Sequence, residues 1–337
     1  MLSINDISEQ AGVSIATVSR VINKNGRYSK ETEERVLKII EENHYVPNMI
    51  AKGLRMQKMK NVGIIVPDIT NEFFMKLFRE IEKNLFARGF GSFLCNTDEQ
   101  EDLERAHVRM MREQNVCGLI YLSGTDHEAD QGERSLPSIY IDRIPKTSRG
   151  TQRCVTSDNV EGGYLAAKEL LEQGCRRILI MTSHKPVSVY RDRFEGYVRA
   201  LTEKGLREED IRAAYLDRLH YRDAYEEMNR LLDSGEFDGD GVFASSDWLA
   251  LGCYKALIEH GKRVSEDVKL VGFDDISVTA FNTVPITTIH QQVDLLGAEA
   301  VRLLFEAMEE KEPLQESTCR RIPVYLVPRR STRTEET

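Results

Sequence analysis

The sequence predicts a small all-α headpiece followed by an α/β body made of two doubly wound parallel-sheet lobes. Three short helical patterns occupy residues 1–46, and from residue 61 onward short apolar runs alternate with helical patterns. The charge divides at the same place, because residues 1–60 carry a net charge of +3 and the remaining residues carry −12. A chain of 337 residues is long enough for about two domains of typical size.

The overall composition is that of an ordinary globular protein, with 41% hydrophobic and 30% charged residues. No apolar run approaches the roughly 18 residues of a membrane span, and the N-terminus has no signal segment. We therefore expect a cytoplasmic protein with no membrane partner. The net charge of −9 argues against a nucleic-acid partner for the chain as a whole. A basic head on an acidic body is nevertheless expected where the head alone approaches a polyanion.

The cysteines and acidic clusters give no sign of a metal, a cofactor or a catalytic group. The six cysteines form no C-x-x-C pair and no cluster at zinc-ligand spacing, so we expect reduced core thiols; they are residues 95, 117, 154, 175, 253 and 319. Asp126, His127, Glu128 and Asp130 lie close in sequence, and a solvated loop explains them better than a metal site. The common phosphate-loop, dinucleotide, hydrolase and zinc-protease motifs are missing from the sequence. The sequence therefore predicts no catalytic residues, no metal site and no cofactor.

The first two helical patterns form a helix-turn-helix. The first covers residues 4–11, and Gly12-Val13-Ser14 then interrupts it with a turn residue and a good N-cap. The second covers residues 15–23 and places Val18, Val21 and Ile22 on one face. Two short helices joined by a three-residue turn containing glycine are typical of this motif.

A third helix follows. Ser29 is its expected N-cap, Glu33 completes much of a capping-box pattern, and Pro47 ends the region. The apolar residues expected to face inward are Val36, Leu37 and Ile40.

The outward face of the second helix offers side chains suited to reading DNA. If its valines pack inward, the residues that point outward are Ile15, Ala16, Thr17, Ser19 and Arg20. A recognition helix enters the major groove with its N-terminal residues at base edges. Arg20 could then hydrogen-bond a guanine, while Ile15 and Ala16 could contact thymine methyl groups. The alternative is a three-helix interaction module with a solvated arginine.

In the body, buried strands alternate with helices, which is typical of parallel doubly wound sheets. The strand patterns cover residues 62–66, 92–95, 118–122, 138–141, 178–181, 241–244 and 269–273. So many units predict two sheets in tandem, with a ligand beyond the carboxyl ends of the strands.

Polar and aromatic residues follow these strands in the pattern that a polyhydroxylated ligand requires. They are Asp68, Asn71, Phe73, Phe74, Ser123, Asp142, Arg143, Ser246, Asp247, Asp274 and Asp275. Carboxylate and amide oxygens bind hydroxyl groups, and aromatic rings stack on the apolar faces of sugars. The alternative is that the acids cap the following helices, and for Asp247 and Asp275 we expect that capping role.

The headpiece sequence resembles that of the lactose-repressor/galactose-repressor family of bacterial transcription regulators. The similarity lies in residues 4–23, which contain Ala11-Gly12-Val13-Ser14-Ile15-Ala16-Thr17-Val18-Ser19-Arg20, and in the hinge-like residues 45–54. It extends over essentially the whole chain. The resemblance implies DNA contacts by Ser3, Ile4, Ile15, Ala16, Thr17, Ser19, Arg20, Asn23, Ser29, Thr32, Tyr45, Asn48, Ala51 and Leu54.

The resemblance also implies a role for the segment after the headpiece. Residues 47–58 are short for an isolated helix, and Gly53 weakens helix formation further, so the segment should order only on binding. In the family, paired hinge helices insert a leucine into the minor groove, and Leu54 occupies that place here, with Asn48 and Ala51 on the same side. The alternative is a flexible linker whose Leu54 packs on the body.

The body resembles the sugar-type effector domain of the same family, which is itself similar to periplasmic binding proteins. The matching segments are residues 67–74, 141–143, 191–197, 271–275 and 287–291. The resemblance implies effector contacts by Asn71, Phe73, Phe74, Ser123, Asp142, Val189, Arg193, Leu219, Ser246, Asp274 and Gln291. Val189, Ser246 and Leu219 (or Tyr221) depart from the residues usual at their places, so the identity of the effector stays open.

Together these features predict a headpiece over residues 1–46, a hinge over 47–60 and a two-lobed effector-binding and dimerisation domain over 61–337. The expected function is that of a ligand-responsive regulator, more a repressor than an activator, whose homodimer binds a pseudo-palindromic operator. Only a few polar residues follow Thr332, so we expect no heptad tail and no tetramer. The alternatives are a solute-binding protein of transport, which would share the body, and an enzyme on doubly wound sheets.

Overall fold

A computed structural model provides the structure of the chain. The described residues are 3–22, 24–43, 60–123, 136–144, 152–185, 187–207, 211–310 and 317–333. The chain divides into two compact units, Met1–Met59 and Lys60–Thr337, and each is described by itself. None of the helices in the described ranges is both long enough and apolar enough to cross a membrane.

The headpiece contains three helices, α1 (Ile4–Ala11), α2 (Ile15–Ile22) and α3 (Lys30–Glu42). A capping box starts α1, because the Asp6 amide donates to Ser3 Oγ at 3.3 Å and the Ser3 amide donates to the Asp6 carboxylate at 2.6 Å. Gly12 ends α1 at φ +63°, a conformation that glycine adopts without strain. The next turn positions Ser14 Oγ to accept from the Thr17 amide at 3.2 Å, which caps α2.

The three helices share one apolar core and confirm the predicted helix-turn-helix. Its buried members are Ile7, Ala11, Val18, Val21 and Val36. Two details of the third helix were wrong. Leu37 is 44% exposed and does not face the core. Ser29 Oγ accepts from the amide of Thr32 at 3.2 Å, so Thr32 rather than Glu33 is the partner at the helix start.

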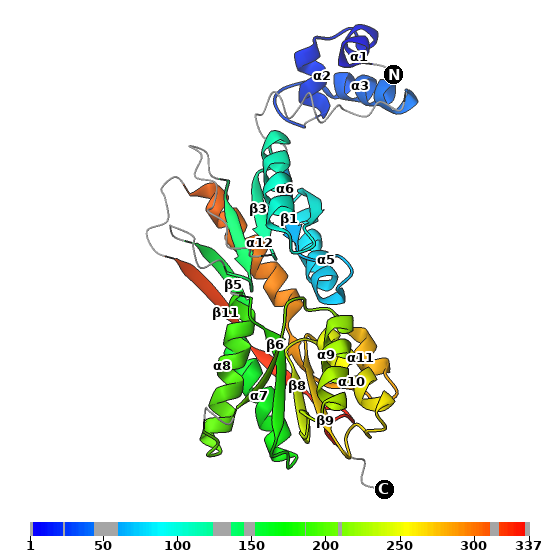
Figure 1. Cartoon of the computed structure of the whole chain (residues 1–337). Helices are drawn as coiled ribbons and strands as arrows, with labels where there is room; N and C mark the ends of the chain where they lie inside the picture. The colour runs from blue at the N-terminus through cyan, green and yellow to red at the C-terminus, as the bar shows by residue number, and fades with distance from the viewer. Residues whose placement is uncertain are drawn as a thin grey trace. The chain divides into compact units, whose positions relative to one another are not determined.

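The body contains two six-stranded sheets, as predicted (Figure 1). The first has the order β11-β5-β4-β3-β1-β2, and the second has the order β12-β10-β9-β8-β6-β7. Strands of the first are β1 (Asn61–Val66), β2 (Gly91–Asn96), β3 (Gly118–Tyr121), β4 (Ser138–Ile141), β5 (Arg153–Ser157) and β11 (Thr318–Ile322). Strands of the second are β6 (Ile178–Ser183), β7 (Arg212–Leu216), β8 (Gly241–Ala244), β9 (Lys269–Phe273), β10 (Thr287–Gln291) and β12 (Val324–Val327). All pairings are parallel except β10 with β12.

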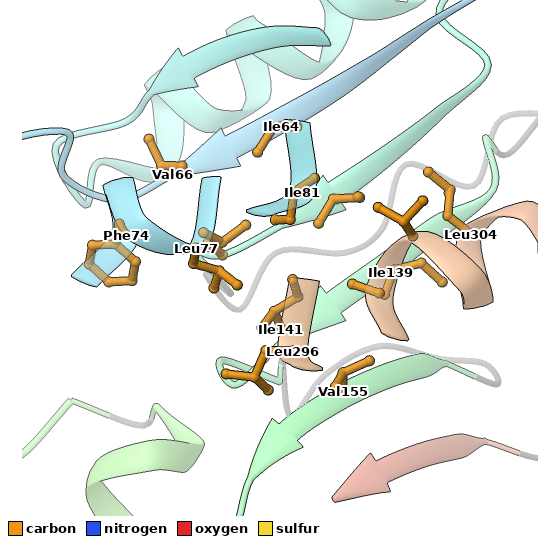
Figure 2. Close-up of a cluster of buried hydrophobic side chains, with 14 of the residues drawn as sticks. Ile64, Val66, Phe74, Leu77, Ile81, Ile139, Ile141, Val155, Leu296 and Leu304 are labelled. Atoms are coloured by element: carbon orange, nitrogen blue, oxygen red, sulfur yellow. The ribbon is translucent and has the colours of Figure 1, made fainter. Parts of the chain in front are cut away.

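Helices cover both faces of the first sheet, and the resulting lobe is the first lobe. They are α5 (Glu72–Phe86), α6 (Glu101–Glu113) and α12 (Val293–Glu309). Successive side chains of β1 point to opposite faces of the sheet. Ile64 packs in the cluster with α5 and α12, and Ile65 packs in the cluster with α6. Figure 2 shows side chains of α5 and α12, such as Leu77 and Leu304, over strand residues such as Ile139.

The second sheet is covered in the same way and forms the second lobe. Its helices are α7 (Asn159–Glu172), α8 (Ser188–Glu203), α9 (Tyr221–Asp233), α10 (Asp247–Glu259) and α11 (Ser277–Phe281). One buried cluster joins α7 and α8 to the sheet, and another joins α9 and α10 to it. Figure 1 shows these two helix pairs on opposite sides of β6 and β8.

The chain passes between the lobes three times. It leaves the first sheet after β5 at Ser157, returns from β10 at Gln291 to enter α12, and crosses again at Pro323 between β11 and β12. These crossings place residues from distant parts of the sequence at one boundary.

The strands that the sequence did not predict lie mostly at the margins of the sheets. In β11, four of the five residues are exposed, so no apolar run marks it. In β5, Val155 lies between arginine, cysteine, threonine and serine, and its apolar signal is weak.

The expectation that every cysteine is a reduced core thiol was wrong for one pair. Cys154 and Cys319 face each other in the register of β5 and β11, and the structure joins them by a disulfide. Cys95, Cys175 and Cys253 are free and buried. The sequence offered no sign of the pair, because 165 residues separate its members.

Candidate functional site

A cavity of about 830 Å³ lies between the two lobes, at the carboxyl ends of strands from both sheets. Its wall includes residues that follow β1, β2 and β4 in the first lobe and β6, β7, β8 and β9 in the second. This is where doubly wound sheets bind ligands, and the volume falls in the range of small-molecule pockets.

Arg193, on α8, is the most firmly held side chain of the cavity wall. Its Nε donates to Asn159 Oδ1 at 2.8 Å and its Nη1 donates to the Ser245 carbonyl at 2.6 Å. The guanidinium lies 3.6 Å from the centre of the Phe273 ring, and Nη1 is 3.6 Å from Asp274 Oδ1. A fixed, buried cation of this kind can present its remaining N–H groups to a ligand without further ordering.

Asp142 forms the acidic group of the first lobe. Its Oδ1 accepts hydrogen bonds from the Ser157 amide at 2.7 Å, Thr156 Oγ1 at 3.1 Å and Asn159 Nδ2 at 3.3 Å. Oδ2 is buried and has no hydrogen-bond partner within the described ranges. Burial raises the pKa of Asp142, although Arg193 and the hydrogen bonds oppose the rise. An unpaired buried carboxylate oxygen in a cavity wall is suited to accept a ligand hydroxyl.

Asp274 is the corresponding acidic group of the second lobe. Gln291 Nε2 donates to its Oδ1 at 2.7 Å, and Ser157 Oγ donates to Gln291 Oε1 at 2.6 Å. Burial raises the pKa of Asp274 to about 7, while Arg193 and Gln291 lower it and Asp142 raises it further. Asp142 and Asp274 are therefore connected by hydrogen bonds through Ser157 and Gln291, the residues at which the chain passes between the lobes.

The expected capping role of Asp247 and Asp275 was wrong. Ser246 caps α10, with its Oγ accepting from the Leu249 amide at 3.3 Å. Asp247 is fully buried and accepts from Thr288 Oγ1 at 2.7 Å and from the Ile276 amide at 2.8 Å. Asp275 accepts from His290 Nδ1 at 2.8 Å and from Arg329. Both acids therefore hold loops of the second lobe together.

The aromatic wall has two parts. Phe73 and Phe74 of α5 pack edge to face with ring centres 5.4 Å apart, and both line the cavity. On the second lobe, His220 lines the cavity and stacks on Trp248, the only tryptophan of the chain. Tyr221 stacks on Trp248 and lies tilted against His220, but it is not part of the cavity wall, whereas Leu219 is.

Three ionic residues, Glu99, Arg143 and Lys185, complete the cavity wall. Glu99 Oε1 accepts from Arg143 Nη1 at 3.0 Å, and Glu99 Oε2 accepts from Lys185 Nζ. Arg143 Nη2 also donates to the Tyr190 hydroxyl at 2.9 Å. Burial would raise the pKa of Glu99, but Arg143 and Lys185 outweigh it and hold that pKa below its usual value.

Most of the residues predicted to contact an effector lie in the cavity wall. These are Asn71, Phe73, Phe74, Asp142, Val189, Arg193, Leu219, Ser246 and Asp274. Ser123 does not line the cavity, and Gln291 reaches it only through Asp274. Asn71 Oδ1 accepts from the Phe73 amide at 3.0 Å and so also caps α5.

Several cavity residues were missed by the sequence reasoning. They are Glu99, Lys185, Tyr190 and His220 in the wall, and Asn159 behind Arg193. The polar run Thr156-Ser157-Asp158-Asn159 directly after Val155 was a usable signal, because polar side chains at the carboxyl end of a strand lie where doubly wound sheets bind ligands. No local sequence pattern predicts Glu99 or Lys185 as cavity residues, because the contact between them depends on how the two lobes pack.

In the headpiece, the residues predicted to face DNA lie largely on the surface. Ile15, Ala16 and Arg20 of α2 are exposed, and Thr17 and Ser19 are partly exposed. Ser3 is engaged in its capping box, while Ser29 Oγ and Thr32 Oγ1 hydrogen-bond each other at 2.8 Å. Ile4 packs against the headpiece core.

Other predictions fall outside the described residues. These are the DNA contacts of Asn23, Tyr45, Asn48, Ala51 and Leu54 and the loop with Asp126, His127, Glu128 and Asp130. Within the described ranges, no group of three or more His, Cys, Asp and Glu side chains could hold a metal ion.

Two models of protein families match the chain. Residues 3–48 match the model described as bacterial regulatory proteins, lacI family, and residues 167–332 match a periplasmic binding protein-like domain. The ribose operon repressor of Halalkalibacterium halodurans is 36% identical over 99% of this chain and 98% of its own length.

Solved structures are similar over both units or over the body. The lac repressor dimer bound to operator has a TM-score of 0.84 over 98% of this chain and 99% of its own, and at 23% identity it supports the fold. A lacI-family transcriptional regulator from Enterococcus faecium with bound ribose is 30% identical, with a TM-score of 0.69 over 81% of this chain and 98% of its own.

Proposed function

The chain belongs to the lacI family of bacterial regulatory proteins, and on that premise we propose that a small sugar-type effector in the interlobe cavity sets the affinity of its headpiece for operator DNA. The chain is a ligand-responsive, DNA-binding transcriptional repressor rather than an enzyme or a transport protein. The observation that carries the proposal is the presence, in one chain, of a helix-turn-helix and of a cavity with opposed acids and a fixed arginine.

The chemistry of the cavity favours a neutral, polyhydroxylated effector. Asp142 and Asp274 offer carboxylate oxygens, Arg193 offers N–H donors, and Phe73 and Phe74 offer apolar ring surface. Hydroxyl groups need such acceptors and donors together, and sugar faces pack on rings. The relatives named for ribose or holding it support a pentose as the first compound to test.

The proposed contacts follow from this assignment. For the effector they are Asn71, Phe73, Phe74, Asp142, Val189, Arg193, Leu219, Ser246 and Asp274. Gln291 would act through its hydrogen bond to Asp274. Ser123 stays a predicted contact, although it does not line the cavity. For DNA we retain Ser3, Ile4, Ile15, Ala16, Thr17, Ser19, Arg20, Asn23, Ser29, Thr32, Tyr45, Asn48, Ala51 and Leu54. α2 would enter the major groove with Arg20 at a base edge.

We also propose a homodimer that works in the cytoplasm, where its operator is. A two-fold dimer presents two headpieces to a pseudo-palindromic site. The proposed division is a headpiece over 1–46, a hinge over 47–60 and an effector-binding and dimerisation domain over 61–337. Phe281 of α11 is 89% exposed and Ile69, just before α5, is 44% exposed, and we propose both as candidates for the dimer contact.

Gel-shift competition tests the function directly. The full chain is incubated with the palindromic DNA upstream of its own gene, with scrambled DNA as competitor, in the absence and presence of pentoses and hexoses. We expect specific binding to the palindromic DNA whose affinity at least one sugar changes. A chain that shifts scrambled and palindromic DNA alike, with or without sugar, would contradict the proposal.

A further inference from the structure

Glu99 bridges two cations that come from different lobes. It lies between β2 and α6 in the first lobe, and Lys185 follows β6 in the second. One carboxylate oxygen accepts from Arg143 at 3.0 Å, and the other accepts from Lys185. All three side chains line the cavity. The ion cluster therefore belongs to the cavity wall rather than to the outer surface.

The two cations differ in how firmly they are held. Arg143 donates to the Tyr190 hydroxyl at 2.9 Å, and its guanidinium lies 5.3 Å from the centre of the Phe74 ring. Its side chain is 11% exposed, whereas that of Lys185 is 35% exposed. Within the described residues, Glu99 is the hydrogen-bond acceptor that Lys185 Nζ contacts. Removal of the Glu99 charge would leave Arg143 and Lys185 facing the cavity without the carboxylate that they share.

Two cations that both contact one carboxylate can also bind a phosphate or another carboxylate at that place. Here the protein's own carboxylate fills that site. Arg143 and Lys185 keep the pKa of Glu99 low despite its burial, so Glu99 stays ionised near neutral pH. An incoming anion would have to displace Glu99 and would also approach Asp98, Asp142 and Asp274 of the same wall.

We infer that Glu99 determines the charge selectivity of the effector pocket, an inference that rests on the proposed function. Glu99 occupies the anion site formed by Arg143 and Lys185. The pocket therefore admits neutral sugars and rejects phosphorylated or carboxylated sugars. Like-charge exclusion is a common means of specificity, because it acts against the wrong ligand rather than for the right one.

Inorganic phosphate is a suitable probe, because it tests the anion site without an identified effector and without DNA. Phosphate is titrated into the full-length wild type and into Glu99→Gln by calorimetry, at pH 7.5 and constant ionic strength. We expect Glu99→Gln to bind phosphate at least tenfold more tightly than the wild type. Since Glu99 has φ +56° and asparagine tolerates that region, Glu99→Asn is a second variant that should behave alike.

Asp98→Asn is the matched control, because Asp98 is the neighbouring acid in the cavity wall and accepts only from Asn96 Nδ2 among the described residues. It should strengthen phosphate binding far less than Glu99→Gln does, because it removes one repelling charge but leaves Glu99 bound to Arg143 and Lys185. The gain of Glu99→Gln should disappear in Glu99→Gln/Lys185→Met, which removes one cation of the site. Phosphate binding that is equal in the wild type and Glu99→Gln, or that survives the second substitution, would overturn the inference, whatever the gel shift shows.

Discussion

Asp274 has a buried carboxyl group that is only partly paired and lies in the same cavity wall as a second acid. Gln291 donates to it at 2.7 Å, and Arg193 Nη1 is 3.6 Å away. Burial nevertheless dominates and raises its pKa to about 7. In the unfolded chain the same group ionises near pH 3.8. Between these values the folded protein holds a proton that the unfolded chain has lost, so the free energy of unfolding falls as the pH rises and levels off above pH 7.

Asp274→Asn should remove this part of the pH dependence. We expect the free energy of unfolding of the wild type to fall, between pH 5 and pH 8, by about 3 kcal/mol more than that of the variant, since the fall covers two pH units below the folded pKa and each corresponds to about 1.4 kcal/mol. Urea denaturation at both pH values measures the difference. Parallel pH profiles for the two proteins would show that Asp274 ionises normally.

Arg20 is the exposed basic residue near the end of α2, and its aliphatic chain lies beside Gly26. If it hydrogen-bonds a guanine, Arg20→Ala should weaken operator binding by about 1–3 kcal/mol and relax the preference at one base pair. Fluorescence anisotropy with the operator and with single-base variants measures both effects. An equal loss on every sequence would assign Arg20 to a phosphate instead. Lys38→Ala, on the exposed side of α3, is a suitable control.

At the residue scale, motif position predicted Arg193, Asp142 and Asp274 in the cavity wall, because each follows or faces a strand end. It did not predict the roles of Asp247 and Asp275, which looked like helix caps. Their partners, Thr288, His290 and Arg329, come from distant segments, so no local pattern could reveal them.

At the element scale, glycines set the distance between α7 and α8. A Cβ on Gly196 would lie 1.9 Å from the Val160 carbonyl oxygen, and a Cβ on Gly163 would lie 2.0 Å from that of Arg193. The two helices therefore approach at backbone distance. This approach also lets Arg193 of α8 reach Asn159 at the start of α7.

Gly196→Ala should force the helices apart. Overpacking of this kind costs about 1–3 kcal/mol, and we expect a loss of stability of that size in urea denaturation. We also expect weaker effector binding, because the bond between Arg193 and Asn159 depends on the spacing. Glu195→Ala, at the adjacent exposed position, should change stability by less than about 0.5 kcal/mol. Similar stability of the two variants would contradict the role given to Gly196.

The central strands of both sheets were predictable, because strands such as β1 and β8 are buried on both faces and read as apolar runs. The strands at the margins of the sheets were not predictable. In β11, Cys319, Arg320 and Arg321 are exposed, so the strand has no apolar pattern. Its place beside β5 follows from the third lobe crossing rather than from its own residues.

At the scale of the whole molecule, hydrogen bonds cross between the lobes of the body around the cavity. Ser188 Oγ, at the start of α8, donates to the Asp142 carbonyl at 2.7 Å and accepts from the Ile144 amide at 3.0 Å. Ser277 of α11 donates to Glu72 of α5 on another side. We propose that a ligand acts by changing these contacts and with them the closure of the lobes, and that operator binding depends on the same change.

The net charge also gains a structural meaning. The acidic excess lies in the body, whereas residues 1–60 carry a net positive charge, so the net charge of the whole chain does not describe the part that binds DNA. This division keeps the electrostatic attraction to DNA local to the headpiece.

The central claim is that occupancy of the cavity and affinity for the operator are coupled. The most direct test measures operator binding of the full chain by anisotropy across a titration of the sugar identified by gel shift, and sugar binding with and without operator. We expect the sugar to change the operator Kd and the operator to change the sugar Kd by the same factor, as linkage requires. Arg193→Ala should abolish the effect of the sugar and keep the operator affinity of the sugar-free protein, whereas Arg191→Ala, exposed on the same helix, should behave as wild type. A sugar that binds in the cavity of the wild type and leaves the operator Kd unchanged would contradict the claim.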